Sequence, residues 1–253
     1  MVVIRDRVIN GVTESWDANA AIRAAELANN EDPSYRALIN LALRHLGERV
    51  PAGGSVLDAG CGVGFLTRAM DDAGYDVTAV DPSSESIRQA KLHHPGIADR
   101  FQVATISNFA SANPTRKFDA VVANMTVHNV DKFQTFFRAA HDLLARNGIL
   151  YIATPNPRNY LQTRSDLREL VRDLDLAQPQ TLHRVHFRIR NHEPHPAPIT
   201  FYHHPIKEYL ATARSVGLEI IDFEQPLHVG PGRPSDTSVM VFAPDADAVR
   251  GRG

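Results

Sequence analysis

The sequence predicts an α/β fold, in which helices cover both faces of a mostly parallel sheet. Short apolar runs of strand type alternate with helical patterns through residues 55–154. The run 118–124 is almost continuously apolar, which is typical of a strand buried on both faces. After a helix at 206–216, the strands expected at 218–223 and 237–242 are joined by a loop alone. These last two strands should therefore pair antiparallel.

A glycine-rich turn follows the first strand and organises the rest of the chain. Residues 56–65 read as a strand, a turn containing Gly60, Gly62 and Gly64, and the start of a helix that runs to about residue 73. Glycine is needed where backbone adopts positive φ or lies directly against a ligand. The turn is therefore predicted to bind a flat or extended ligand. Cys61, the only cysteine, is expected to be a small side chain tolerated beside that ligand rather than a redox or nucleophilic group.

Two acidic residues narrow the choice of ligand. The second strand, at 75–80, leads into Asp81, and a carboxylate in this place usually accepts hydrogen bonds from two ribose hydroxyls. Dinucleotide-binding turns have the spacing Gly-x-Gly-x-x-Gly, so the sixth residue should be glycine. In this chain that residue is Phe65. Asp58, two residues before the first glycine, suits a ligand with an ammonium group and disfavours a pyrophosphate. A nucleoside with a cationic group fits these residues better than a dinucleotide does.

The pattern Asp-x-Gly-x-Gly-x-Gly at 58–64 resembles the first motif of the class I S-adenosylmethionine-dependent methyltransferases, and Asp81 stands at their second, ribose-binding motif. The resemblance spans roughly residues 50–243, but only the glycine motif and Asp81 are specific. It implies a Rossmann-like, seven-stranded methyltransferase sheet with an antiparallel last strand. It also implies methyl transfer from S-adenosylmethionine to an oxygen, nitrogen or carbon of a small molecule, and we expect a role in secondary metabolism. A scaffold or non-methyl-transfer protein of this fold, or an NAD-dependent Rossmann enzyme, remains an alternative.

The resemblance also implies where the cofactor binds. Family members often carry an acidic residue near the end of the third strand, expected here at 100–106, that contacts the adenine amino group. Thr105 takes that position, so the sequence departs from the family, and we expect apolar and backbone contacts at Ile106 instead. The predicted cofactor contacts are Trp16, Asp58, Gly60, Cys61, Gly62, Gly64, Asp81, Pro82, Ile106 and Asn124.

The methyl acceptor is expected at the carboxyl end of the fourth strand, because ligands of open α/β sheets bind at that edge. His128 lies just beyond this strand and is the candidate general base, although it would serve equally as a lining residue. Tyr202 and His203 are weaker candidates for the base. The predicted substrate contacts are Met125, Asn129, Tyr202, His203, His228 and Arg233.

Three regions follow from this interpretation. Residues 1–50 form an N-terminal helical cap, residues 51–155 and 205–244 form the cofactor-binding core, and residues 156–204 form an inserted substrate lid. Trp16 is expected to precede the first helix, either as a packing residue or as part of a cap over the cofactor. In the lid, we expect a charged helix at 165–176 and a β-hairpin that ends near residue 203.

Composition limits the partners. Lys plus Arg number 27 and Asp plus Glu number 29, so no global field favours nucleic acid or an acidic membrane. No signal sequence and no apolar run of spanning length is seen, and a cytoplasmic protein is expected. Six histidines lie within residues 183–204, but their spacing matches no common zinc pattern and no cysteine accompanies them, so no metal is expected. A homodimer is allowed for.

Overall fold

The computed structural model describes residues 11–156, 172, 174–187, 189, 192–225 and 237–245. Most of the helix expected at 165–176 lies outside these residues, as do the predicted substrate contacts His228 and Arg233. In the part of the chain that the model describes, no helix is long and apolar enough to cross a membrane.

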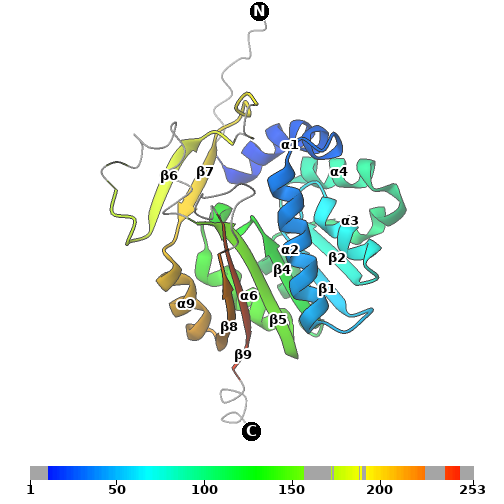
Figure 1. Ribbon diagram of the computed structural model, residues 1–253, viewed down its shortest axis with the longest axis vertical. Coiled ribbons are helices and arrows are strands. Elements are labelled where there is room, and N and C mark those ends of the chain that lie inside the picture. The colour runs from blue at the N-terminus through cyan, green and yellow to red at the C-terminus, as the bar shows by residue number, and fades with distance from the viewer. Residues whose placement is uncertain are drawn as a thin grey trace, which may run out of the picture.

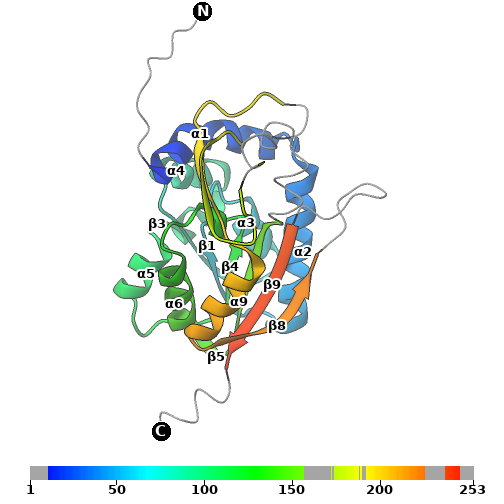
Figure 2. The same ribbon diagram turned by 90° about the vertical axis from the view of Figure 1, so that its left-hand side faces the viewer.

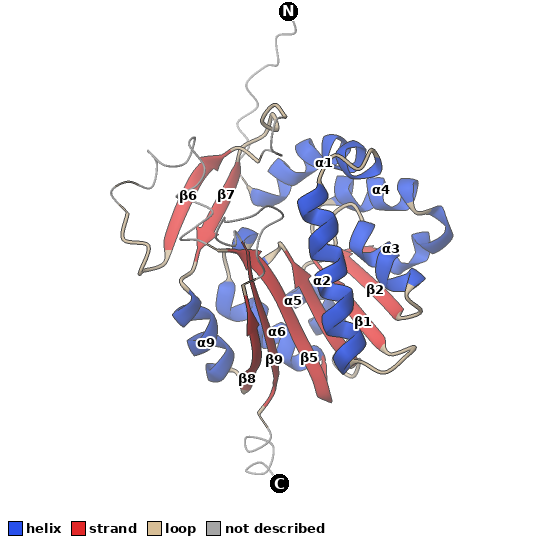
Figure 3. Cartoon of the chain, viewed as in Figure 1, coloured by secondary structure: helices blue, strands red, loops and turns tan. Residues whose placement is uncertain are grey.

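A seven-stranded sheet forms the centre of the molecule, with the order β3-β2-β1-β4-β5-β9-β8 (Figures 1 and 3). Its strands are β1 Ser55–Ala59, β2 Asp76–Asp81, β3 Phe101–Val103, β4 Phe118–Asn124, β5 Leu144–Pro155, β8 Leu218–Glu224 and β9 Thr237–Pro244. β1 to β5 pair in parallel, whereas β9 runs antiparallel to both β5 and β8. The predicted fold class is confirmed, including the reversed last strand.

Helices cover both faces of this sheet (Figure 2). The helices of the described residues are α1 Val12–Ala28, α2 Pro33–Arg49, α3 Phe65–Asp72, α4 Ser84–His93, α5 Ile106–Ala112, α6 Phe133–Leu143 and α9 Ile206–Ser215, with short 3-10 helices η1 Pro95–Arg100 and η2 Val127–Asn129. α1 lies across the end of the molecule, beside α4 and β7 (Ile199–His203) (Figure 1). Local sequence explains several ends. The Asp32 and Ser83 side chains cap α2 and α4, and Gly74, at φ 88°, follows the end of α3 as predicted.

Alternate residues of the central strands feed two separate hydrophobic cores. Leu57 and Val121 point to the face that α5, α6 and α9 cover. Their neighbours Val56 and Val122 point to the opposite face, which α2 and α3 cover. The continuous apolar pattern of β4 is explained by this burial on both sides.

Three expectations about element boundaries are wrong. The third strand ends at Val103 rather than Ile106, because Thr105 caps α5 by accepting a hydrogen bond from the Asn108 amide at 3.1 Å. The sequence pattern predicts a helix that starts at Asp131 and stops at Gly148, but α6 covers only Phe133–Leu143, and β5 already begins at Leu144. Trp16 lies inside α1 rather than before it. The first two errors arise where the Thr105 cap and the pairing of Leu144 with Phe118 override the sequence pattern.

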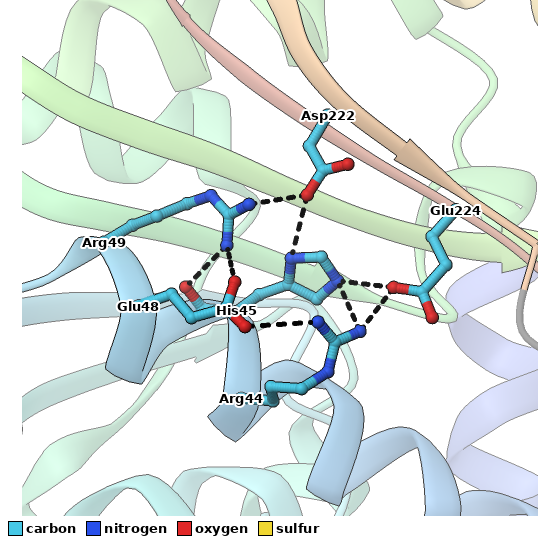
Figure 4. A network of polar contacts seen from close by, with 6 residues as sticks. All are labelled: Arg44, His45, Glu48, Arg49, Asp222 and Glu224. Carbon is cyan, nitrogen blue, oxygen red and sulfur yellow. Dashed lines mark hydrogen bonds and ion pairs between the residues drawn. The ribbon is translucent and has the colours of Figure 1, made fainter.

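A polar network fastens α2 to β8 at the far edge of the sheet (Figure 4). The buried His45 ring lies with Nε2 at 3.2 Å from Glu224 and Nδ1 at 3.6 Å from Asp222. Arg44 pairs with Glu224, and Arg49 pairs with Asp222 at 2.5 Å. Strand β8, which comes late in the chain, is therefore held against the second helix.

A separate two-stranded sheet, β6 Gln180–Val185 and β7 Ile199–His203, forms the expected hairpin. Its register shifts between Leu182 and Val185, and Arg184 has a left-handed φ of 62° there. Basic or histidine side chains alternate with apolar ones through residues 184–190, which predicts a longer strand, but β6 ends at Val185. The hairpin lies beside α1 at the end of the molecule where the parallel strands have their carboxyl ends (Figure 1).

Candidate functional site

The three glycines of the turn have different tasks, although all adopt left-handed φ of 85°, 53° and 85°. A Cβ on Gly60 would lie 2.2 Å from Thr126 Cγ2, and a Cβ on Gly64 would lie 2.8 Å from the Phe101 ring. A Cβ on Gly62 would meet no described atom within 4 Å. Only Gly62 therefore borders open space, whereas the sequence suggested that all three glycines leave room for a ligand.

Asp81 holds this turn in place. Its carboxylate accepts hydrogen bonds from the Gly62 amide and from the Ser83 amide, both at 2.9 Å. Burial raises the pKa of Asp81 to about 6, although the two amide hydrogen bonds oppose the change. Each carboxylate oxygen has a further lone pair. Asp81 can therefore support the turn and still accept hydrogen bonds from a ligand.

The acidic residue that precedes the turn is deeply buried. Asp58 is 1% exposed, and its carboxylate accepts a hydrogen bond of 2.7 Å from the Thr67 hydroxyl. Burial raises the pKa of Asp58 to about 7. A carboxylate in this environment is stabilised by a cationic partner. We refer to residues 58–64 and Asp81 together as the glycine-turn side of the site.

Tyr35 and Asn124 approach the same place from α2 and β4. Burial raises the pKa of Tyr35, and the nearby Asp58 charge adds to this effect. Both side-chain amide atoms of Asn124 are buried and neither makes a hydrogen bond of good geometry to a described residue, although the amide lies near enough to the Tyr35 hydroxyl to oppose the rise in its pKa. Such an unpaired group costs about 1–3 kcal/mol, so a polar ligand that pairs with it gains affinity.

The turn after β4 packs directly against the glycine turn. Met125 has a left-handed φ of 56°, and its amide donates to the Ala153 carbonyl at 2.7 Å. The Thr126 hydroxyl donates to the Gly60 carbonyl at 3.1 Å. Strained, non-glycine backbone of this kind clusters at functional sites. The turn leads into η2 and thereby places His128 next to the hairpin.

His128 is 7% exposed and its ring lies 5.0 Å from the Phe201 ring of β7. The Asn129 amide nitrogen lies 3.3 Å from Nε2 of His128. Nδ1 is buried and has no partner within the described part of the chain. Burial lowers the pKa of His128 to about 3, so the ring is neutral near pH 7.

The end of β7 carries further rings into this region. His203 is 2% exposed, and its Nε2 lies 2.9 Å from the Leu176 carbonyl oxygen. The neighbouring His204 stacks on Phe133 at 3.9 Å between ring centroids. Tyr202, the other candidate of this segment, is partly exposed, and partial burial raises its pKa. We refer to residues 125–129 and 199–204 as the histidine side of the site.

Helix α1 joins the hairpin to the glycine-turn side. The Asn19 side chain donates to the Ala197 carbonyl at 2.8 Å and accepts from the Ala197 amide at 3.1 Å. Nearby, His195 Nε2 lies 2.8 Å from the Glu26 carboxylate, and both side chains are buried. Toward α4, Asp17 accepts from the Ser83 hydroxyl at 2.6 Å. A single helix therefore touches both sides of the site.

The predicted site residues separate into three groups. Asp58, Gly62, Asp81 and Asn124 lie at the turn, whereas His128 and Asn129 belong to η2, which contacts β7. Met125 lies between them and is bonded through its amide to Ala153 of β5. Four other predicted cofactor contacts are not brought to the turn by any described hydrogen bond of their side chains to a polar site residue. Trp16 packs on the hairpin core, and Ile106 lies in the main core. Pro82 is exposed, and Cys61 is buried, which raises the pKa of its thiol. The remaining predicted contacts at 228 and 233 lie outside the described residues.

Sequence reasoning missed Tyr35, Asn19, Asp17 and Thr126. Their positions depend on how α1, α2 and the β4 turn fold back on the sheet edge, and no local motif marks them. The left-handed backbone at Met125 has no sequence signal either. Among the described residues, no group of three or more His, Cys, Asp or Glu side chains is arranged to hold a metal ion.

Comparison with known protein families gives one matching model, a methyltransferase domain that covers residues 31–194. The ubiquinone biosynthesis O-methyltransferase of Xanthomonas axonopodis pv. citri is 33% identical over 51% of this chain and 55% of its own. The mitochondrial enzyme of the same name from Rattus norvegicus is 32% identical over 47% of this chain and 36% of its own. The chain thus spans about half the length, or less, of these curated relatives.

Solved structures share the fold at low sequence identity. An S-adenosylmethionine-dependent methyltransferase from Clostridium acetobutylicum matches with a TM-score of 0.61 and 15% identity, over 89% of this chain and 98% of that one. The 1,6-didemethyltoxoflavin-N1-methyltransferase of Burkholderia thailandensis, solved with bound 1,6-didemethyltoxoflavin and S-adenosylhomocysteine, matches with a TM-score of 0.59 and 17% identity, over 95% and 93% of the two chains. At these identities the match establishes the fold.

Proposed function

Since the chain belongs to the methyltransferase-domain family, we propose that it transfers a methyl group from S-adenosylmethionine to an oxygen, nitrogen or carbon of a small molecule. The curated relatives are named O-methyltransferases, which favours oxygen. The predicted secondary-metabolic role, the cytoplasmic location and the homodimer stay predictions, as does the expectation that neither nucleic acid nor membrane is a partner.

One observation supports this proposal more than any other. Gly62 borders open space while its amide donates to Asp81, whose remaining lone pairs face no described hydrogen-bond donor. A ribose placed against Gly62 would pair its two hydroxyls with that carboxylate. The raised pKa of Asp58 and the unpaired amide of Asn124 support a cationic, polar ligand end on the other side of the turn.

The bound donor would supply an activated methyl group on a sulfonium, so the protein has three tasks. It orients the donor through residues 58–64, Asp81 and Asn124, and it positions the acceptor against Met125, Asn129, Tyr202 and the two buried histidines. It also keeps water from the reaction, a task that suits the hairpin clamped by Asn19. Residues 228 and 233 remain proposed acceptor contacts from the sequence alone.

Calorimetric titration with S-adenosylhomocysteine and, separately, with NAD tests the proposal. Binding of the first alone is expected. Asp81→Ala should weaken that binding by about 1–3 kcal/mol, because the ribose hydrogen bonds are lost. Asp76→Ala, at the exposed start of the same strand, is the control and should leave the affinity unchanged. Binding of NAD alone, or equal affinity in both variants, would refute the proposal.

A further inference from the structure

The two buried histidines of the site, His128 and His203, differ in which ring nitrogen carries the hydrogen. The contact of His203 is with the Leu176 carbonyl oxygen, at 2.9 Å from Nε2. A carbonyl oxygen only accepts hydrogen bonds, so Nε2 must carry the ring hydrogen. Burial also lowers the pKa of His203, which keeps the ring neutral. Its other nitrogen, Nδ1, therefore presents a lone pair.

The His128 ring is fixed in the other tautomer. The Asn129 amide nitrogen, 3.3 Å away, only donates, so Nε2 of His128 accepts and Nδ1 carries the hydrogen. Neither this Nδ1–H nor the Nδ1 lone pair of His203 has a partner in the described part of the chain, although both atoms are buried. Buried polar atoms are paired in most folded proteins, so two unpaired atoms of complementary type indicate a polar ligand.

The fold brings the two rings to one face of β7. Phe201 and His203 are two residues apart and both are buried, so their side chains point to the same side of the strand. His128 packs on the Phe201 ring, and β7 contacts η2. His203 and the Phe201 ring that His128 contacts are therefore neighbours on one side of β7, so a single small acceptor molecule could meet both histidines.

We propose that His203, through Nδ1, is the general base that removes the proton from a hydroxyl of the methyl acceptor, and that His128 donates an Nδ1 hydrogen bond to an oxygen of the same molecule. This inference rests on the proposed methyl transfer and names the acceptor class as a hydroxylated small molecule with a second oxygen. It competes with the sequence-based prediction that His128 is the base.

The step balances without any further reactant. The hydroxyl proton passes to Nδ1 of His203. The Nε2–H group of the resulting imidazolium continues to donate its hydrogen bond to the Leu176 carbonyl oxygen. The electron pair of the acceptor oxygen forms the new bond to the methyl carbon and displaces sulfur together with the electron pair of the old carbon–sulfur bond. His203 then releases one proton to water. Throughout the step, His128 stays neutral and holds the acceptor.

Amide isosteres separate the two roles. The Gln side-chain nitrogen imitates Nε2–H, so His203→Gln keeps the donor to Leu176 but removes the basic lone pair. The Asn nitrogen imitates Nδ1–H, so His128→Asn keeps the donor and His128→Gln misplaces it. For a hydroxylated acceptor found by screening, kcat should fall by about 100-fold or more in His203→Gln and only a few-fold in His128→Asn. The reverse order would overturn the proposal.

Two readouts do not require turnover. In ¹⁵N-histidine spectra of the wild-type protein at neutral pH, His203 should show the Nε2–H tautomer and His128 the Nδ1–H tautomer, with signals assigned by loss in the variants. The second probe is 4-nitrophenol, whose anion absorbs visible light, added with S-adenosylhomocysteine at a pH where the free phenol is mostly neutral. The wild type and His128→Asn should bind it as the anion, and His203→Gln should not.

The outcomes are distinguishable. If S-adenosylhomocysteine binds but the phenol stays neutral or unbound, or if either tautomer is reversed, the histidine assignment is wrong and the proposed function stands. If S-adenosylhomocysteine itself fails to bind, the proposed function fails first. The wild-type tautomers decide the assignment even if a variant does not fold.

Discussion

The glycine-turn side and the histidine side of the site differ in how their polar groups are paired. On the first, the Asp81 carboxylate and the Gly62 and Ser83 amides satisfy one another within a short stretch of chain. On the second, buried nitrogens of His128 and His203 have no partner among the described residues, and the segments that carry them are far apart in sequence. The polar groups of the first surface are thus held in place by one another, whereas those of the second leave buried nitrogens unpaired within the described residues.

This difference has a physical reason. A co-substrate that many enzymes have in common can be recognised through backbone amides and one carboxylate, and a short motif can position these groups by itself. A small molecule that varies between enzymes is recognised by side chains on separate elements. Polar groups that have no partner within the protein can then pair with that molecule. The comparison therefore predicts where substitutions cost stability and where they cost ligand affinity.

The largest effect is expected within the glycine turn. Gly60→Ala places a Cβ at 2.2 Å from Thr126 Cγ2 in left-handed backbone, and it should lower the free energy of unfolding by about 2–5 kcal/mol. Gly62→Ala has the backbone strain but no clash, so it should cost about 1–2 kcal/mol of stability and act mainly on S-adenosylhomocysteine affinity. Chemical denaturation and calorimetry measure the two effects. Equal destabilisation by both variants would contradict the division of tasks among the glycines.

A smaller effect is expected where α1 clamps the hairpin. Asn19→Ala removes both hydrogen bonds to Ala197 and leaves that peptide group unpaired, so the local stability of residues 195–203 should fall by about 1–3 kcal/mol. Hydrogen exchange of the hairpin amides should accelerate accordingly, with the protection of β1 and β4 unchanged. Asn29→Ala, at the exposed end of the same helix, serves as the control. Unchanged exchange in Asn19→Ala would show that the hairpin is held by other contacts.

The pH dependence of binding tests the glycine-turn side alone. The pKa of Asp81 is about 6 and lies above the ordinary value for aspartate because the carboxyl is buried, so the ionised acceptor form is lost as pH falls below about 6. S-adenosylhomocysteine affinity should fall by about tenfold from pH 7.5 to pH 5. Asp81→Asn should bind more weakly at pH 7.5 and flatten this dependence. A wild-type profile that Asp81→Asn leaves unchanged would assign the titration to another group, with Asp58 the first candidate.

The raised pKa values of Asp58 and Asp81 also determine whether the free energy of unfolding rises or falls with pH. The folded-state pKa values of Asp58 and Asp81 exceed the unfolded values, so the native state binds more protons between about pH 4 and 7. The contribution of these groups to folding stability therefore declines as pH rises through that range. Ligand binding to the ionised carboxyls offsets this loss.

The smallest effect is expected in the network between α2 and β8, which touches neither side of the site (Figure 4). Glu224→Gln keeps a hydrogen-bond acceptor for His45 and loses only the charge opposite the half-exposed Arg44. Stability should fall by about 0.5–1 kcal/mol, and less in high salt. Ligand affinity should stay at the wild-type value. A change in affinity would show that the sheet edge is coupled to the site.

Local sequence determined the glycine-turn side almost completely. The strand, the three glycines and Asp81 lie within one strand–turn–helix–strand unit, whose hydrogen bonds are formed by neighbours in sequence and are therefore readable as a spacing. The alternation of strands and helices likewise predicted the order of elements and the antiparallel end of the sheet. Boundaries failed at Val103 and Leu143, where a cap or a strand partner decided the end of the element.

Tertiary structure alone decided the histidine side and the tasks of single residues. Nothing local indicates that Gly60 is required by Thr126, that Tyr35 approaches Asp58, or that the Leu176 carbonyl selects the tautomer of His203. These properties depend on contacts between segments far apart in the chain, and such contacts leave no periodic or spaced pattern in one sequence. The sequence thus determined the fold and the glycine motif, whereas the packing of α1, α2 and the hairpin decided which side chains gather on the histidine side.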